Sequence, residues 1–254
     1  MGKKPEKHMN KLGLLGKNIS YSFSRSYFKK KFEDEKITNT SYENFDIENI
    51  ELFPSIIKDT KNLKGLNVTI PYKEAVIPYL DKINKKAKEI GAVNTIKITK
   101  KGKLVGYNTD YYGFKKTIEP YLKSSHKKAL ILGTGGASKA IAFSFKKLGI
   151  DYSYVSRTAS KNVDFTYNNL TESTILEHQI IINCTPLGTF PNIDDCPGIP
   201  YKGISSNHIL FDLIYNPEET KFLKLGKDNG ATIINGLNML KLQAEKAWSI
   251  WNLR

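Results

Sequence analysis

Cysteine is scarce in this chain of 254 residues, which has only Cys184 and Cys196. Because there is no C-x-x-C pair and no Cys/His cluster, the sequence argues against a disulfide-built scaffold and a structural zinc site, and we expect no metal. Two isolated cysteines are typical of a reduced, cytoplasmic protein. We interpret Cys184, which follows an apolar run, as a small core residue rather than a nucleophile.

Long apolar runs are missing as well. No stretch approaches the roughly 18 residues of a membrane span, and the N-terminus carries no secretory signal. We therefore expect no membrane partner. The first eight residues, MGKKPEKH, resemble an expression leader, so we expect the native chain to begin at Met9.

Arginine is nearly absent, although the formal net charge is +14. Arg25, Arg157 and Arg254 are the only arginines, and lysines spread along the whole chain supply the other positive charges. Because nucleic-acid readers rely on arginine forks and basic stripes, this pattern argues against a nucleic-acid partner. A basic field still favours an anionic cofactor and a carboxylate substrate.

Strand-like apolar runs alternate with helical patterns, a rhythm typical of βαβ units and of a parallel α/β fold. In the first part we expect strands at residues 12–16, 40–45, 66–70, 95–98 and 104–107, and helices at 25–32, 47–59, 72–80 and 83–90. In the second part we expect a helix at 111–122, strands at 129–132, 152–155, 180–183, 209–213 and 232–234, and a last amphipathic helix at 237–251. The boundary between the two parts lies near residues 106–125.

A glycine turn joins the strand at 129–132 to a following helix, in the run ALILGTGGASKAIAFSFKKLG. Glycines permit a tight turn and a close approach of backbone to a pyrophosphate, which the free N–H groups of the helix then bind. The alternative is a glycine-rich turn that binds nothing. The complete strand-turn-helix unit favours a dinucleotide site formed by Gly133, Thr134, Gly135, Gly136, Ala137 and Ser138.

The end of the next strand indicates which dinucleotide binds. An NAD site would place an acidic residue here for the ribose hydroxyls, but the chain has Ser156, Arg157 and Thr158, with Lys161 following. The planar fork of arginine suits a phosphate. We therefore predict NADP as the cofactor.

Polar side chains gather at the ends of three further strands. The run GLNVTIPYKEAV delivers Asn67, Thr69 and Lys73, the run GAVNT adds Asn94, and GYNTDYYGF adds Asp110. An ammonium, a carboxylate and several amide or hydroxyl groups can hold a polyhydroxylated substrate and move its proton. Without this context, Lys73 would be interpreted as a solvated lysine that opens a helix.

These runs closely resemble the shikimate dehydrogenase family, in order and spacing, along nearly the whole chain. The resemblance implies an N-terminal α/β substrate domain (residues 9–110, completed by the helix at 237–254) and an NADP-binding, Rossmann-like, doubly wound parallel sheet (residues 111–236). It implies that Lys73 and Asp110 form the catalytic acid/base pair. It also implies that Asn67, Thr69 and Asn94 contact ring hydroxyls of the substrate.

The N-terminal segment GLLGKNISYSFSRSYF resembles the family's segment with two serines that bind the substrate carboxylate, which match Ser20 and Ser22. Asn18, Tyr21 and Arg25 depart from the family pattern, and Arg25 is either an added charge near the carboxylate or a surface residue. Further matches imply substrate contacts at Tyr215 and Gln243, and cofactor contacts at Thr185, Leu213 and Gly236.

The resemblance implies reversible NADPH-dependent reduction of 3-dehydroshikimate to shikimate, in the shikimate pathway of aromatic amino-acid and chorismate biosynthesis. The chain would act as a monomer or a homodimer. Three alternatives remain open: a quinate/shikimate dehydrogenase with relaxed cofactor use, a non-catalytic NADP-sensing protein on the same scaffold, and an enzyme of the methylenetetrahydrofolate dehydrogenase type.

Overall fold

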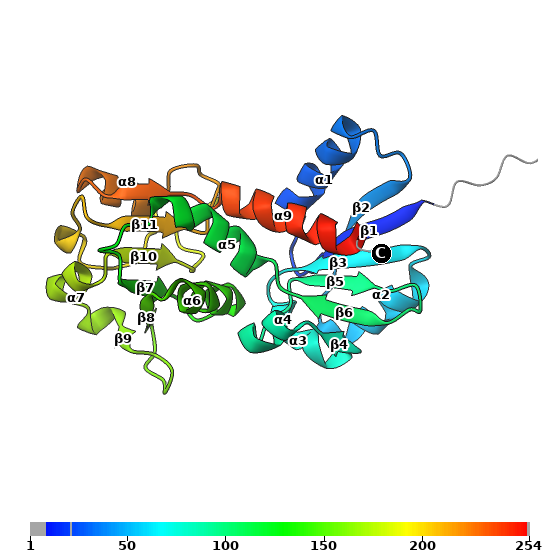
Figure 1. The fold of residues 1–254 in the computed structure, drawn as a ribbon, viewed down its shortest axis with the longest axis horizontal. Helices are drawn as coiled ribbons and strands as arrows, with labels where there is room; N and C mark the ends of the chain where they lie inside the picture. The colour runs from blue at the N-terminus through cyan, green and yellow to red at the C-terminus, as the bar shows by residue number, and fades with distance from the viewer. Residues whose placement is uncertain (1–8, 21, 253–254) are drawn as a thin grey trace, which may run out of the picture. The chain divides into compact units, whose positions relative to one another are not determined.

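The computed structural model describes residues 9–20 and 22–252, so the expected leader and Tyr21 lie outside the described residues. The chain forms two compact units (Figure 1). The first unit comprises the chain up to Thr109 together with the residues from Ala244 onward, and the second comprises Asp110–Gln243. The first division lies between Thr109 and Asp110, one residue before the expected end of the first domain at residue 110. The second division lies inside the last helix, between Gln243 and Ala244.

The first unit is built on a mixed six-stranded sheet. The strand order is β2-β1-β3-β5-β6-β4, with bounds β1 Asn10–Gly16, β2 Thr40–Asp46, β3 Leu63–Val68, β4 Lys82–Ile83, β5 Thr95–Ile98 and β6 Leu104–Tyr107. The expectation of parallel pairing is wrong for β5, which runs antiparallel to both β3 and β6. The turn between β5 and β6 is too short for a parallel crossover, and Gly102 takes a φ of +75° there.

The first helix of this unit is longer than expected, and the other three are shorter. They are α1 Phe23–Asp34, α2 Phe53–Asp59, α3 Tyr72–Ala75 and α4 Lys85–Ile90, with 3₁₀ turns at Ile50–Leu52 and Ile77–Tyr79. The helix expected at 83–90 begins late because Ile83 belongs to β4 and the Asn84 side chain caps the first turn. The helix expected at 72–80 is interrupted before Pro78, since the residue preceding a proline disfavours helical geometry. The segment expected as one helix at 47–59 contains instead the 3₁₀ turn at Ile50–Leu52 and then α2.

Two apolar clusters cover the two faces of this sheet. Successive strand residues point to opposite faces, so Leu15 joins a cluster with Leu66 and Phe53, whereas Leu14 packs with Phe28 in the other. The last helix, α9 (Leu237–Asn252), contributes Ala244, Trp248 and Trp251 to the second cluster. These clusters fix the strand ends that carry the polar residues.

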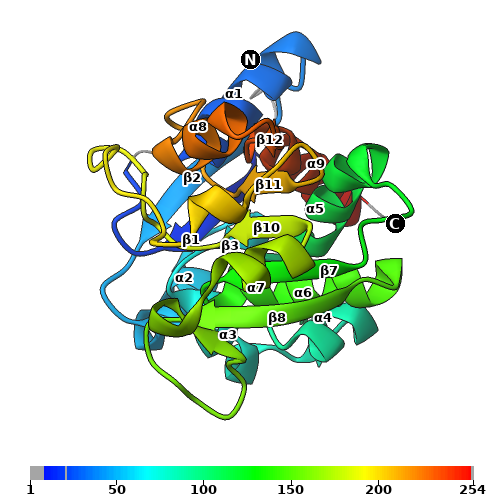
Figure 2. The same cartoon turned by 90° about the vertical axis from the view of Figure 1, so that its left-hand side faces the viewer.

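The second unit is a fully parallel sheet in the order β12-β11-β10-β7-β8-β9, which Figure 2 shows from one side. Its strands are β7 Lys128–Leu132, β8 Asp151–Ser156, β9 Phe165–Thr166, β10 Ile180–Asn183, β11 Ile209–Asp212 and β12 Thr232–Ile234. Counted within the unit, this is the order 6-5-4-1-2-3 of a Rossmann fold. The predicted fold class, two α/β domains with a Rossmann-like sheet in the second, is confirmed.

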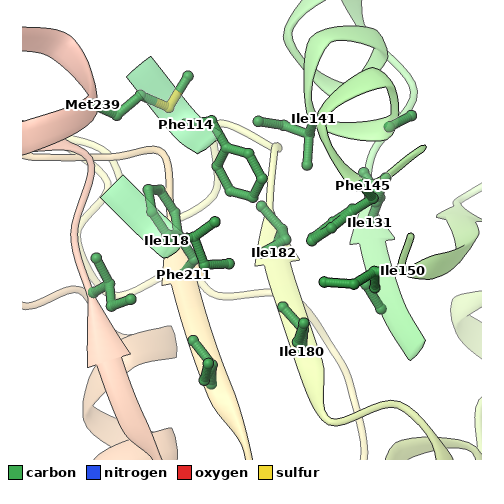
Figure 3. Packing of buried hydrophobic residues seen from close by; sticks show 14 residues of the cluster. Phe114, Ile118, Ile131, Ile141, Phe145, Ile150, Ile180, Ile182, Phe211 and Met239 are labelled. Atoms are coloured by element: carbon green, nitrogen blue, oxygen red, sulfur yellow. The ribbon is translucent and has the colours of Figure 1, made fainter. Parts of the chain in front are cut away.

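Helices lie on both sides of the parallel sheet. They are α5 Asp110–Ile118, α6 Gly136–Leu148, α7 Glu172–Glu177 and α8 Lys221–Asp228, with 3₁₀ turns at Glu119–Tyr121, Tyr167–Asn169 and Tyr201–Gly203. The sequence prediction missed α7 and α8. One face packs Phe114, Ile182 and Phe211 into a continuous core (Figure 3), and the other packs Leu210 and Phe222. Within the described residues, no helix is long and apolar enough to cross a membrane.

Candidate active site

Polar residues of the first unit meet at one edge of the sheet. The parallel strands β1, β3 and β6 end at this edge, and the antiparallel strand β5 begins there. Thr69 therefore follows β3, Asn94 precedes β5, and Thr109 follows β6. Residues that lie far apart in the sequence are brought together because the strand directions alternate in this way.

Asn94 is the centre of this edge. Its backbone N–H donates to the Tyr107 carbonyl at 3.0 Å, and its own carbonyl accepts from the Val68 N–H at 2.8 Å, which ties β3 to β6. The side-chain oxygen accepts from the Thr109 backbone N–H at 2.6 Å, and the amide nitrogen donates to the Thr109 hydroxyl at 3.0 Å. Asn94 is buried, so these bonds fix its side chain in one orientation.

Asn67 is enclosed within the protein. It is only 3% exposed. Its side-chain oxygen accepts from the Tyr42 hydroxyl at 2.8 Å, and its amide nitrogen lies 3.2 Å from the Thr95 hydroxyl and 3.3 Å from the Asn94 carbonyl oxygen. Both amide hydrogens are thus used inside the protein, which leaves one oxygen lone pair for any further contact.

Thr69 lies over the end of β1. Its backbone N–H donates to the Leu15 carbonyl at 2.9 Å. A β-carbon placed on Gly16 would meet the Thr69 methyl group at 2.6 Å, so glycine at this position allows the two loops to approach. Thr69 is partly exposed at the sheet edge, beside the fully enclosed Asn67.

Lys73 stands in the single turn of α3, and its side chain is half-buried. Its backbone carbonyl accepts from the Val93 N–H at 2.7 Å. The preceding Tyr72 donates its hydroxyl to the Ile47 carbonyl at 2.7 Å and its backbone N–H to the Thr69 carbonyl at 2.9 Å. These bonds compensate for the shortness of α3, which could not stand alone in water.

The two serines lie on the loop that enters α1. Ser22 is the N-cap, and its hydroxyl accepts from the Arg25 N–H at 3.3 Å, while Ser20 is exposed. The carboxylate of Asp46 accepts the backbone N–H groups of Asn18 and Ile19 at 2.8 and 3.0 Å. Asn18 has a φ of +56°, which proline cannot adopt. Asn18 is therefore compatible with this loop conformation, whereas proline would not be.

Asp110 and Gln243 belong to the second unit. Asp110 is the first residue of α5 and is buried. A β-carbon on Gly113 would lie 3.2 Å from the Gln243 backbone nitrogen and 2.5 Å from the Met239 carbonyl oxygen, so α5 and α9 are closely packed. Gln243 on α9 therefore lies against Gly113, which is about one helical turn after Asp110 on α5.

The glycine turn between β7 and α6 is open. Gly133 has a φ of +100°, and a β-carbon there would approach the Thr185 methyl group at 3.2 Å. Gly135 is the N-cap of α6 and provides no side-chain hydrogen bond, and a β-carbon on it would meet nothing within 4 Å. Ser138 is buried, and its hydroxyl donates to the Gly135 carbonyl at 2.6 Å. The start of α6 thus has no side-chain cap and is open in front of Gly135, an arrangement that favours binding of an anion.

Thr185 lies beside this turn on a rigid loop. Its hydroxyl donates to the Asn183 side-chain oxygen at 2.7 Å, and the Asn183 amide donates to Asp212 at 3.1 Å. Asp212 also accepts from the Thr220 hydroxyl and the Ile214 N–H. Burial raises the pKa of Asp212 to about 6, although its hydrogen-bond donors oppose that rise.

Leu213 and Gly236 are neighbours at the ends of β11 and β12. A β-carbon on Gly236 would overlap the Leu213 carbonyl group, and the Gly236 N–H donates to the Ile214 carbonyl at 2.9 Å. Only glycine therefore permits these two backbones to lie together. Tyr215, two residues after Leu213, is half-buried, and burial raises the pKa of its hydroxyl.

The residues after β8 lie on an exposed loop. Arg157, Thr158 and Lys161 are exposed, and Ser156 at the strand end is partly buried. A pocket of about 610 Å³ lies between this loop and the glycine turn, and Thr134, Lys139, Tyr154 and Lys161 are among its lining residues. Two lysines, Lys139 and Lys161, and one carboxylate, Asp164, line this pocket, so its charged lining is positive on balance and favours an anionic group.

Sequence reasoning missed three residues of the buried network, namely Tyr42, Thr95 and Thr109. A signal for two of them was present, because the dipeptide Asn-Thr occurs at Asn94-Thr95 and again at Asn108-Thr109. Tyr42 gave no such signal. In the described part of the chain, no group of three or more His, Cys, Asp and Glu side chains could hold a metal ion.

Comparison with known proteins identifies the family. Residues 14–96 match the family model for the shikimate dehydrogenase substrate binding domain. A shikimate dehydrogenase (NADP(+)) from Clostridium beijerinckii is 41% identical over 248 residues, which cover 94% of this chain and 90% of that protein. The match thus extends over both units.

Solved structures agree with this result. The crystal structure of shikimate dehydrogenase from Aquifex aeolicus is 34% identical, with a TM-score of 0.85 over 96% of this chain and 92% of the other. Shikimate 5-dehydrogenase from Thermus thermophilus, in complex with NADP(H) and shikimate, is 28% identical, with a TM-score of 0.85 over 96% and 94%. The resemblance found in the sequence is confirmed, and the chain belongs to the shikimate dehydrogenase family.

Proposed function

We propose that this protein catalyses the reversible reduction of 3-dehydroshikimate to shikimate, with NADPH as the hydride donor. The Clostridium relative is an NADP(+) shikimate dehydrogenase, and the Thermus homologue binds NADP(H) and shikimate. The observation that carries the proposal is the polar edge of the first unit, where Lys73 is bonded through its backbone to the segment that carries Asn94. In this proposal the first unit binds the substrate and the second binds the cofactor.

The second unit fits a dinucleotide. The α6 N-terminus lacks a side-chain cap, and the position of a Gly135 β-carbon is open space. The N–H groups there and Thr134 would hold the pyrophosphate, with Ser138 stabilising the turn by its bond to the Gly135 carbonyl. Thr185, Leu213 and Gly236 would line the nicotinamide end. The proposed pyrophosphate site also includes Gly133, Gly136 and Ala137.

Arg157 and Lys161 select the phosphorylated dinucleotide in this proposal. Both are exposed on the loop after β8, where an NAD site would need an acidic residue. A guanidinium fork can bind a phosphate through two parallel hydrogen bonds. Ser156 and Thr158 flank Arg157 and would supply further hydrogen bonds to the adenosine side.

Hydroxyl and amide groups of the first unit would hold the substrate. Ser20 and Ser22 precede α1, where free N–H groups favour an anion such as the substrate carboxylate. Thr69 and Asn94 would contact the ring hydroxyls, as would the remaining lone pair of Asn67. Tyr215 and Gln243 are further proposed substrate contacts, on the resemblance of their runs to the family.

Lys73 is the proton donor in the proposed reaction. When bound, NADPH supplies a hydride to the substrate carbonyl carbon, and negative charge develops on the carbonyl oxygen. The Lys73 ammonium stabilises that charge and donates a proton to form the new hydroxyl group. In the reverse direction the same amine accepts the proton.

Asp110 is the second member of the proposed acid/base pair and accepts a hydrogen bond from the same hydroxyl. Thr109 is fixed in the first unit by its N–H bond to Asn94. Because neighbouring Cα atoms lie about 3.8 Å apart, the backbone of Asp110 stays within one peptide of that network. This covalent constraint supports a role for Asp110 at the polar edge.

The proposal extends to where and in what form the enzyme acts. Both cysteines are free thiols, as is usual in a reducing compartment, and we place the enzyme in the cytoplasm. It acts as a monomer or a homodimer, without a nucleic-acid partner.

Substitution of Lys73 tests the proposal. We expect Lys73→Ala to lower kcat with shikimate and NADP by about 10²- to 10⁴-fold, because the proton donor is lost. The affinity for NADP and the melting temperature should stay near wild type. Lys85→Ala is the matched control, since Lys85 is an exposed lysine that opens α4 in the same unit. Wild-type turnover in Lys73→Ala would refute the assignment.

A further inference from the structure

A chain of buried hydroxyl and amide groups crosses the sheet of the first unit, beginning at Tyr42 on β2. The Tyr42 ring stacks on Phe28, with ring centroids 4.6 Å apart and an interplanar angle of 17°. Its hydroxyl donates to the Asn67 side-chain oxygen at 2.8 Å. Burial raises the pKa of Tyr42, so the hydroxyl keeps its proton and remains a donor.

The Tyr42 hydroxyl anchors the oxygen end of the Asn67 amide. An asparagine amide can turn by half a rotation, which exchanges its oxygen and its NH₂ group. The Asn94 carbonyl can only accept, so the NH₂ group faces it and the Thr95 hydroxyl, and the oxygen faces Tyr42. The Tyr42 hydroxyl is the donor to this buried oxygen, and a buried acceptor that loses its donor is costly.

The segment that Asn67 holds, residues 93–95, is bonded to two other stretches of the chain. The Val93 N–H donates to the Lys73 backbone carbonyl at 2.7 Å. The Asn94 side-chain oxygen accepts from the Thr109 N–H at 2.6 Å. One short segment therefore positions the backbone of Lys73 and the residue that precedes Asp110.

We infer that Tyr42 is a positioning residue: by anchoring the Asn67 amide through its oxygen, it holds segment 93–95 and, through that segment, the backbones of Lys73 and Thr109. The inference rests on the proposed function, which makes Lys73 and Asp110 the catalytic pair. Tyr42 touches no reacting atom in this account. Its effect is on alignment, and a misplacement of about 1 Å can slow an enzyme about 100-fold.

The substitution Tyr42→Phe removes one oxygen atom and keeps the stacked ring. We expect kcat with shikimate and NADP to fall about tenfold or more, with an unchanged dissociation constant for NADP. Hydrogen exchange should become faster at the Val93, Asn94 and Thr109 amides. Tyr201→Phe is the matched control, because the Tyr201 hydroxyl is bonded to the Pro197 carbonyl in the second unit. It should change neither kcat nor the exchange at those three amides.

Thr95 provides a second test, because its hydroxyl accepts from the Asn67 amide at 3.2 Å and donates to the Asn94 side-chain oxygen at 3.1 Å. Thr95→Val should lower kcat like Tyr42→Phe, and Thr95→Ser, which keeps the hydroxyl, should restore it.

Two results would overturn the inference. The first is a Tyr42→Phe enzyme with wild-type kcat and wild-type amide exchange. The second is an equal increase in hydrogen exchange at the Val93, Asn94 and Thr109 amides in Tyr42→Phe and in Tyr201→Phe, which would indicate a general loss of stability. If the wild-type protein does not turn over shikimate, the proposed function fails and the catalytic part of the inference fails with it. The exchange comparison would still decide whether Tyr42 holds segment 93–95. Should Tyr42→Phe not fold, the Thr95 pair gives the same readouts.

Discussion

The substitution Gly135→Ala should separate the requirements of folding from the requirements of NADP binding. The backbone angles of Gly135, φ −74° and ψ 178°, are open to alanine, and a β-carbon there would meet nothing within 4 Å. Loss of glycine entropy in the unfolded chain favours Gly135→Ala by about 0.4–1 kcal/mol, whereas alanine is a poorer N-cap by a similar amount. The free energy of unfolding should therefore change by less than about 1 kcal/mol.

NADP binding should respond very differently to Gly135→Ala. The new methyl group would occupy the space in front of the free N–H groups of α6, where the pyrophosphate is expected. Losing one hydrogen bond to a charged phosphate costs about 1.5–3 kcal/mol, which raises the dissociation constant about 10- to 150-fold. Titration calorimetry measures this constant, and thermal melting monitors the fold.

Gly198→Ala is the matched control for this experiment. Gly198 is also exposed, lies in the same unit, and has open space around the position of its β-carbon. It should leave both NADP affinity and melting temperature unchanged. Equal NADP affinity in Gly135→Ala and Gly198→Ala would show that the turn does not bind the pyrophosphate, and a large loss of stability in Gly135→Ala would show that the fold itself needs this glycine.

Three further predictions concern specificity and stability. Arg157→Gln should raise KM for NADP about 10- to 100-fold but hardly change KM for NAD, because the phosphate fork is lost; steady-state kinetics with both cofactors measures this. Gly65→Ala should cost about 1–3 kcal/mol in urea unfolding, since the new methyl group would overlap the Trp251 indole and break its bond to the Ile96 carbonyl; wild-type stability would contradict the packing. Burial lowers the pKa of His126, so its neutral form stabilises the fold above about pH 6.5 and this contribution is lost as the pH falls below that value. When the pH is lowered from 7.5 to 5.0, the urea midpoint of the wild-type protein should fall further than that of His126→Gln.

Strong local patterns allowed much of the fold to be predicted. The strands β5, β6, β10 and β12 lie at their predicted bounds, because each is an apolar run or alternation ended by a polar residue or a glycine. The two-residue strands β4 and β9 are too short to show a period. The direction of β5 depends on the length of a turn, so the alternation of helix and strand patterns did not reveal it.

Local sequence patterns also predicted only part of the candidate site. Lys73, Asn94 and Asp110 could be proposed as site residues from the sequence, because the runs that carry them resemble those of the family. The bond between Tyr42 and Asn67 joins positions 25 residues apart and depends on strand register, which no local pattern encodes. Likewise, Gly236 matched a family position, but its close approach to Leu213 is visible only in three dimensions.

The most direct test of the account is the initial rate at which the wild-type protein forms reduced cofactor, NADPH or NADH, measured by absorbance. Shikimate and quinate would each be supplied with NADP and with NAD. The account predicts rapid turnover with shikimate and NADP, and little with NAD. Turnover with NAD would contradict the specificity assigned to Arg157, and turnover with quinate would favour the quinate/shikimate dehydrogenase alternative. No turnover with any pair, in a protein that still binds NADP, would contradict the proposed function.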